Sequence, residues 1–182
     1  MRFAVFMFVV VIAFGLAPAR ADQRDPRLDG LFQVLKTASP LDAPAVRRQI
    51  ADIWADAPSD TVDLLIDRAE TMIEDGDDAA AATLLNAVVD LAPHFAHGYA
   101  LRGGLNLALA ETEKARADLE RAIALEPRHF QARLALAALL ARSDDTEAAY
   151  DMLRATLLID PQNASAMERM QKLQPEIDSQ EI

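Results

Sequence analysis

The sequence contains no cysteine, which excludes disulfides, cysteine-based metal sites and thiol chemistry. Aromatic residues are scarce, at 5% of the chain, with a single tryptophan. Basic residues are outnumbered, since 18 Lys and Arg face 29 Asp and Glu, for a net charge of −11. Phosphate contacts need clustered Lys and Arg, so this balance argues against nucleic acid and anionic lipid as partners.

Long apolar runs are absent except at the start of the chain. Arg2 precedes an apolar run over residues 3–16, and small residues follow up to Ala21. This pattern predicts a signal peptide over residues 1–21, cleaved after Ala21. The run is shorter than the roughly 20 residues that span a bilayer, although an uncleaved membrane anchor is the alternative. Residues 22–182 would then hold 16 basic and 29 acidic residues, a net charge of −13, in a periplasmic or secreted protein with no membrane insertion after cleavage.

Three prolines recur at a fixed interval: Pro93, Pro127 and Pro161 are each 34 residues apart. Proline interrupts a helix because it lacks an amide hydrogen and its ring collides with the preceding turn. It also drives the residue before it out of helical geometry. A constant interval between such stops predicts an array of repeats.

An alignment of three units, beginning at Val62, Ala96 and Phe130, supports this prediction. Small residues occupy positions eight and twenty of every unit, and aliphatic residues occupy positions twenty-four and thirty. In order of position, they are Ala69, Gly103 and Ala137; Ala81, Ala115 and Ala149; Leu85, Leu119 and Leu153; Leu91, Leu125 and Ile159. The small residues would let two helices approach closely, and the aliphatic ones would fill the space against the neighbouring unit.

A polar break lies near the middle of each unit, at 74–78, 110–114 and 142–147. Each unit is therefore predicted to be a pair of antiparallel helices. The fold class is all-α, a right-handed superhelical array of helix-turn-helix repeats with flanking capping helices. The acidic residues in the breaks are interpreted as helix N-terminal charges, with an acidic docking edge as the alternative.

These units resemble tetratricopeptide repeats (TPRs), on the residues at positions eight, twenty, twenty-four and thirty-two. The chain departs from the family pattern at position seven, where Arg68 and Arg102 replace an apolar residue. It also departs at position four in the third unit, Arg133, and at position eleven in the second, Asn106. The stretches at 28–36, 50–54 and 61–65 also resemble those of small secreted bacterial tetratricopeptide proteins. Together the two resemblances imply a small secreted bacterial protein that acts as a protein-binding scaffold.

The flanks of the array are predicted to be helical as well. Residues 22–61 hold two apolar stripes at helical spacing and are predicted to form a hairpin that packs on the first repeat. The repeats are assigned to 62–95, 96–129 and 130–163, which together span 62–163. A capping helix follows at 164–174, and 175–182 is predicted to be a flexible tail.

No catalytic, cofactor or metal site is predicted. His94, His97 and His129 flank the turns between units and are expected to be exposed, because no motif of metal-binding spacing accompanies them. The acidic run at 74–78 lacks the alternation and terminal Glu of a calcium loop. The chain is therefore predicted not to be an enzyme, and no cofactor is expected.

The family resemblance implies a concave groove lined by the first helix of each unit. The residues assigned to it are Ile66, Glu70, Ile73, Ala100, Gly104, Leu107, Ala108, Leu134, Ala138, Ala141 and Arg142. The hypothesis is that this groove holds a hydrophobic segment of another envelope protein, as an adaptor or assembly factor. Three alternatives stay open: an accessory subunit or regulator of an envelope enzyme such as a cell-wall hydrolase, a groove filled by a flank of the chain itself, and a face that belongs to the core. The family's carboxylate clamp is not supported, because Ile66 and Glu70 occupy its positions.

Overall fold

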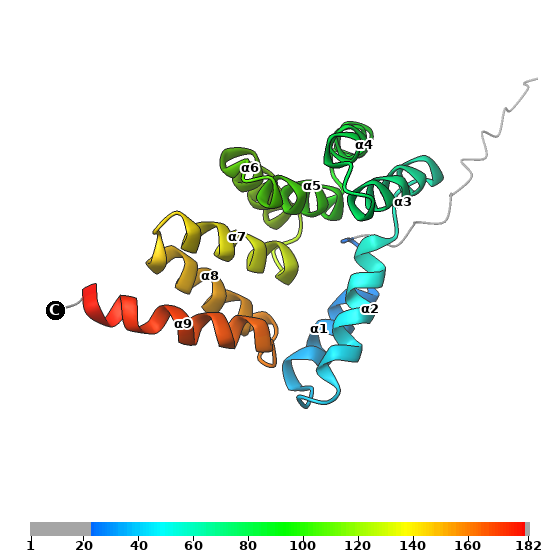
Figure 1. Cartoon of the computed structure of the whole chain (residues 1–182). Coiled ribbons are helices and arrows are strands. Elements are labelled where there is room, and N and C mark those ends of the chain that lie inside the picture. Colours follow the sequence, from blue (N-terminus) through cyan, green and yellow to red (C-terminus); the bar gives the residue numbers. More distant parts are fainter. Residues whose placement is uncertain (1–22, 181–182) are drawn as a thin grey trace, which may run out of the picture.

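The computed structural model describes residues 23–180, which form nine α-helices and no strand (Figure 1). The all-α solenoid of helix-turn-helix repeats is confirmed, whereas the predicted signal peptide lies outside the described residues. The helices are α1 (Arg27–Thr37), α2 (Ala43–Ala55), α3 (Asp60–Glu74), α4 (Asp78–Leu91), α5 (Ala96–Ala108), α6 (Thr112–Leu125), α7 (Phe130–Arg142), α8 (Thr146–Ile159) and α9 (Ala164–Gln180). Within 23–180, no helix has the length and apolar content to cross a membrane.

The three proline turns have the same backbone geometry. Ala92, Glu126 and Asp160 each precede a proline, and their φ angles are −130°, −132° and −131°. Each of them still donates its amide to the helix carbonyl four residues before it. A proline therefore ends the second helix of each pair, as its effect on the preceding residue requires.

The turns inside the helix pairs are also repeated. Gly76, Ala110 and Asp144 occupy position fifteen of their units, with φ angles of 78°, 59° and 58°. This left-handed conformation costs an L-residue roughly 1–2 kcal/mol, and only glycine adopts it freely. The geometry of the turn is thus kept in all three units, although glycine is present at this position only in the first.

The acidic residues in these turns act at helix N-termini in two units. The side chains of Asp77 and Asp145 accept hydrogen bonds from the amides of Ala80 and Ala148 at 3.0 and 3.4 Å. Glu111, in the second unit, makes no such capping bond. Capping therefore explains the acidic turns of the first and third units.

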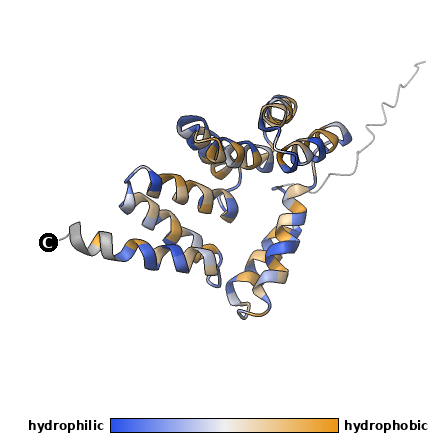
Figure 2. Ribbon diagram, in the orientation of Figure 1, coloured by the Kyte–Doolittle hydropathy of each residue, from blue (hydrophilic) through white to orange (hydrophobic). Residues whose placement is uncertain are grey.

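Small residues bring the paired helices together as predicted. All three residues at position eight, all three at position twenty and all three leucines at position twenty-four are buried. A Cβ added to Gly103 would lie 2.9 Å from Cγ of Leu119, which shows how close α5 and α6 are. Position thirty differs from the prediction, because Leu91 is 60% exposed. In Figure 2 the paired helices carry both hydrophobic and hydrophilic residues, as half-buried helices must.

The N-terminal hairpin, α1 and α2 with residues 23–26 before them, does not stack on α3 and α4 of the first repeat. Its helices contact α5 and α8 instead, so the prediction that the hairpin packs on the first repeat was wrong for α1 and α2 (Figure 1). The apolar faces of α1 and α2 close on each other and on Phe130 and Ile159, which lie beside the proline turns. The hairpin therefore runs along the turn edge of the array.

Polar contacts tie this hairpin to all three proline turns. Gln23 binds the first turn, donating to the carbonyl of His94 and accepting from the amide of Ala96. At the second turn, Arg128 donates to Asp29 at 2.6 Å, and at the third, Arg47 donates to the fully buried Asp160 at 2.9 Å. The periodic pattern gave no sign of these contacts, because each is made once.

The last helix, α9, packs against α8 and covers the C-terminal end of the array. Hydrophilic residues predominate along it in Figure 2, as expected for an end cap. It continues to Gln180, so the predicted tail beginning at residue 175 was wrong for 175–180. Pro175 removes one amide donor, a loss that distorts a helix without necessarily ending it.

Candidate functional site

The predicted groove residues lie on α3, α5 and α7, but they differ in accessibility. Glu70, Ile73, Ala108 and Arg142 are exposed. The half-buried residues are Ala100, Gly104, Leu107, Leu134, Ala138 and Ala141. Ile66 is buried, in a cluster with Val62, Val88 and Phe95, so its assignment to the groove was wrong. The side chain of Phe95, from the following turn, makes this position part of the core.

On α5 the predicted groove contains Gly104, so no side chain fills the surface at that point. A Cβ added to Gly104 would meet no atom within 4 Å, whereas one added to the adjacent Gly103 would collide with Leu119. Gly104 therefore faces open space on the side away from the paired helix. The exposed Ala108 lies one turn further along α5, so this surface is built from small residues.

Near the C-terminal end of the array, a hollow of about 210 Å³ lies between α7 and α9. Ala138 and Ala141 line it, together with Ala137, Leu153 and Leu173, while Arg169 and Lys172 supply its polar lining. Arg169 also donates to the carbonyl of Leu134 at 2.9 Å, which fixes α9 against α7. Leu134 packs in one cluster with Met170 and Leu173 of α9, so it is part of the core beside the hollow.

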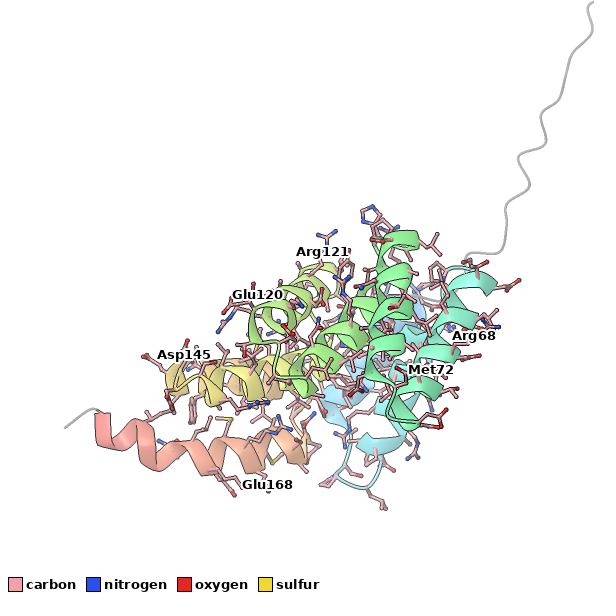
Figure 3. All side chains as sticks on the ribbon, turned by 45° about the horizontal axis from the view of Figure 1, so that its top comes forward. Arg68, Met72, Glu120, Arg121, Asp145 and Glu168 are labelled. Atoms are coloured by element: carbon pink, nitrogen blue, oxygen red, sulfur yellow. The ribbon has the colours of Figure 1, made fainter. Side chains whose placement is uncertain are left out.

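The two ends of the groove differ in charge. On α3, Asp63, Asp67, Glu70 and Glu74 are all exposed. At the other end lie Arg142, Arg169 and Lys172, and Arg142 donates to the carbonyl of Leu107 at 3.3 Å, linking α7 to α5. Figure 3 shows the two ends, with Arg68 and Met72 of α3 far from Asp145 and from Glu168 on α9. An occupant of the groove would thus meet negative charge at one end and positive charge at the other.

Two of the three turn histidines are not exposed, which corrects the prediction for them: His129 is fully buried and His97 is half-buried. The His129 ring stacks on Trp54 with 4.3 Å between the ring centroids. The centroid of the His97 ring lies 6.0 Å from that of the His129 ring. Burial lowers the pKa of His97 to about 4, and burial together with the neighbouring His97 lowers that of His129 to about 3. Both rings are therefore neutral near pH 7 and serve the hairpin interface.

The departures from the family pattern on α5 form a polar cluster. Arg102 donates to both carboxylate oxygens of the buried Asp118, at 2.9 and 2.6 Å, and Asn106 donates to the same carboxylate at 3.0 Å. Arg102 also reaches Asn86 on α4, at 2.9 Å. Arg102 and Asn106, at positions seven and eleven, thus donate to one buried carboxylate, and these hydrogen bonds compensate the burial of its charge.

These features can be compared with known proteins. No family model matches the chain. A TPR repeat-containing protein of Rhizobium etli is 32% identical over 148 residues, which cover 81% of this chain and 72% of the relative. The chain is a tetratricopeptide-repeat protein.

Solved TPR domains have the same fold as this TPR protein. The Sgt2 TPR domain from Aspergillus fumigatus superposes with a TM-score of 0.64 at 17% identity, over 69% of this chain and 84% of that domain. The first TPR of Spaghetti, solved with an HSP90 peptide, superposes with a TM-score of 0.63 at 18% identity, over 67% of this chain and 97% of that one. At such identities the likeness establishes the fold alone.

Proposed function

We propose that this TPR protein is a non-enzymatic adaptor or assembly factor of the bacterial cell envelope, which holds a segment of another protein in the groove of α3, α5 and α7. The observation that carries the proposal is the small, open surface at Gly104 and Ala108 on α5, together with the hollow at Ala138 and Ala141 on α7. Gly104 and Ala138 both occupy position nine of their units. Backbones approach closely where side chains are small, so a chain segment fits such a surface.

The lining indicates the chemistry of the segment. An apolar side chain would fill the hollow of about 210 Å³, whose lining is mostly alanine and leucine. Acidic groups next to it would be favoured by Arg142, whereas Lys172 is already paired with Glu168 at 2.6 Å. Basic groups would be favoured at the α3 end by Glu70. Two TPR neighbours were solved with an HSP90 or an HSP70 peptide, which supports an occupant of peptide type here.

A matched pair of glycine substitutions tests the groove. Gly104→Arg would place a long cation in the groove, whereas Gly30→Arg would place one on α1, and an added Cβ has open space at both. Affinity capture from envelope extracts, with mass spectrometry, would compare the two variants with the parent. We expect Gly104→Arg and Ala138→Arg to lose the partner and Gly30→Arg to keep it. Equal recovery from all of them would rule out the groove.

The envelope location rests on residues 1–21, whose basic start, apolar run and small-residue ending are typical of a signal peptide. N-terminal sequencing of the chain recovered from a periplasmic fraction tests it. We expect a first residue of Asp22. An intact Met1 in the membrane fraction would instead indicate a retained anchor.

The non-enzymatic role rests on the nature of the groove. Its lining is dominated by alanine, glycine and leucine, which offer no nucleophile and no acid–base pair. Among residues 23–180, no group of three His, Asp or Glu residues is arranged to hold a metal ion. Turnover of an envelope substrate that persists after removal of every co-purified protein would contradict this part of the proposal.

A further inference from the structure

In the second and third repeats, one face of the first helix is covered by the second helix of the repeat before it. This face contains positions three, seven and eleven. In the third repeat these are Ala132, Leu136 and Leu140, which are 1%, 4% and 5% exposed and pack with Leu119 of α6. In the second repeat the face is also covered at position three, since a Cβ on Gly98 would lie 2.8 Å from Val88 of α4, while Arg102 at position seven is half-buried.

The same face of α3 lies open. Its residues are Leu64, Arg68 and Met72. Leu64 is 52% exposed and Arg68 is exposed, whereas Met72 is half-buried and packs partly against the cluster of Ala81 and Leu85. Figure 3 shows Arg68 and Met72 at the end of the array opposite to α9. The N-terminal hairpin lies along the proline turns, against α5 and α8, and does not stack on this face. The array is therefore covered at its C-terminal end and open at its N-terminal end.

The second repeat shows what such a face binds. Arg102, at position seven of α5, donates to Asn86 on the preceding helix at 2.9 Å. Arg68 holds the same position on α3, and it makes no ion pair or side-chain hydrogen bond with the residues whose side chains the structure describes. A covering helix would therefore supply apolar side chains to Leu64 and Met72 and a hydrogen-bond acceptor to Arg68.

We propose that this face, defined by Leu64, Arg68 and Met72, docks a basic amphipathic helix of another protein. Basic residues are inferred from the acidic border of the face, where Asp63 and Asp67 lie exposed on α3. Residues 60–91 hold nine acidic residues and one basic residue. Lysine or arginine beside the apolar stripe of the incoming helix would offset this charge and speed association.

A second copy of this chain fits the face poorly. Two α3 helices placed face to face would bring together two strongly acidic repeats and two copies of Arg68. A head-to-tail stack would need an open C-terminal end, but α9 covers that end. The occupant is therefore a different protein, and its site is separate from the groove at Gly104.

A photo-crosslinking residue at position 64 of the full chain, introduced in the native host, tests the proposal directly. The control carries the same residue at position 41, where Leu41 is 88% exposed but lies between α1 and α2, away from the face. Mass spectrometry of the adduct would identify the crosslinked segment. We expect a segment of another protein with apolar residues at helical spacing and net positive charge, captured from position 64 only.

A peptide titration measures the chemistry. The probe is a 15-residue helical peptide with leucines on one face, a glutamate among them and lysines on both flanks; its control has glutamates on the flanks. Fluorescence anisotropy would compare the parent with Leu64→Asp, Arg68→Glu and the groove variant Gly104→Arg, with helicity checked by circular dichroism. We expect at least tenfold weaker binding for the two face variants and for the acidic peptide, and unchanged binding for Gly104→Arg.

Four results would overturn the proposal. They are crosslinks from position 64 to a second copy, crosslinks to residues 1–22, equal adducts from positions 64 and 41, and peptide binding that the face variants leave intact. Loss of binding in Gly104→Arg alone would assign the peptide to the groove. Failure of the end-face proposal would leave the groove proposal standing, because the two use different variants.

Discussion

Neighbouring repeats pack through alanine, glycine and leucine, whereas the N-terminal hairpin meets the same repeats through aromatic rings and ion pairs. The first kind of contact recurs every 34 residues, so each unit solves the same packing problem. The second kind is made once at each turn, by Gln23, Arg128 and Arg47. The difference implies that the hairpin and the array respond separately to mutation and to pH.

Acid should weaken the hairpin interface more than any single substitution. The pKa of His97 falls to about 4 and that of His129 to about 3 on folding, while the unfolded values lie near 6.5. The unfolded chain therefore binds more protons below pH 6.5, and the stabilisation present above that pH is lost as pH falls towards 4. We expect a loss of up to about 3 kcal/mol per histidine, since one unit of pKa corresponds to about 1.4 kcal/mol. Urea titrations from pH 7 to pH 4 measure it.

The control for this loss is a variant that lacks the two rings. His97→Gln/His129→Gln should be less stable than the parent at pH 7 but should lose less stability between pH 7 and pH 4. His94→Gln, at an exposed position, should keep the pH profile of the parent. If the double variant keeps the parental slope, protonation of other groups governs the acid response.

Trp54→Ala should have the next largest effect. Trp54 is 1% exposed and contacts Phe32, His129 and Phe130. Removing a buried tryptophan costs about 3–5 kcal/mol. We expect the hairpin to become sensitive to protease while the array stays helical, as read by limited proteolysis and circular dichroism. Leu41→Ala, at a site 88% exposed, is the control, and a single cooperative transition in Trp54→Ala would show that hairpin and array unfold as one unit.

The same contrast explains how much the sequence predicted. The proline interval and the small residues at positions eight and twenty recur in three units. Because three units support each inference, the helix pairs could be predicted from the sequence. The hairpin contacts do not recur: nothing in the sequence pairs Arg47 with Asp160, which are 113 residues apart. The enclosure of His97 and His129 was not predicted for this reason. The only signal was that Trp54, Phe32 and Phe130 are large apolar residues that need packing partners.

The groove was predictable only in part. Family geometry places positions nine and thirteen on the open side, and Gly104 and Ala108 lie there. It also placed Ile66 there, but Ile66 is buried in a cluster with Phe95 of the first proline turn. The residue type at that turn position differs between the units, with Phe95, His129 and Asn163, so the pattern did not predict this cluster. The hollow near Ala138 needs Arg169 and Leu173 of α9, so its depth depends on how the last helix docks.

Ala115→Phe should disturb the repeated packing by a smaller amount. Ala115 is fully buried at position twenty, between α5 and α6. Overpacking of a filled core costs about 1–3 kcal/mol. The matched control is Ala117→Phe, two residues along the same helix and exposed, which we expect to change the melting temperature little. Equal melting temperatures for the two variants would contradict the assigned role of position twenty.

The smallest effects should come from alanine substitutions at two adjacent glycines, which should change the stability in opposite directions. Within α5, a Cβ at Gly104 meets no atom within 4 Å, so Gly104→Ala should stabilise the chain by about 1 kcal/mol through helix propensity alone. A Cβ at Gly103 would lie 2.9 Å from Cγ of the buried Leu119, so Gly103→Ala should gain the same propensity and lose more to the collision. Thermal unfolding of both variants measures the difference. Since the two positions are neighbours in one helix, stabilisation by both would mean that α5 and α6 are not in close contact at position eight.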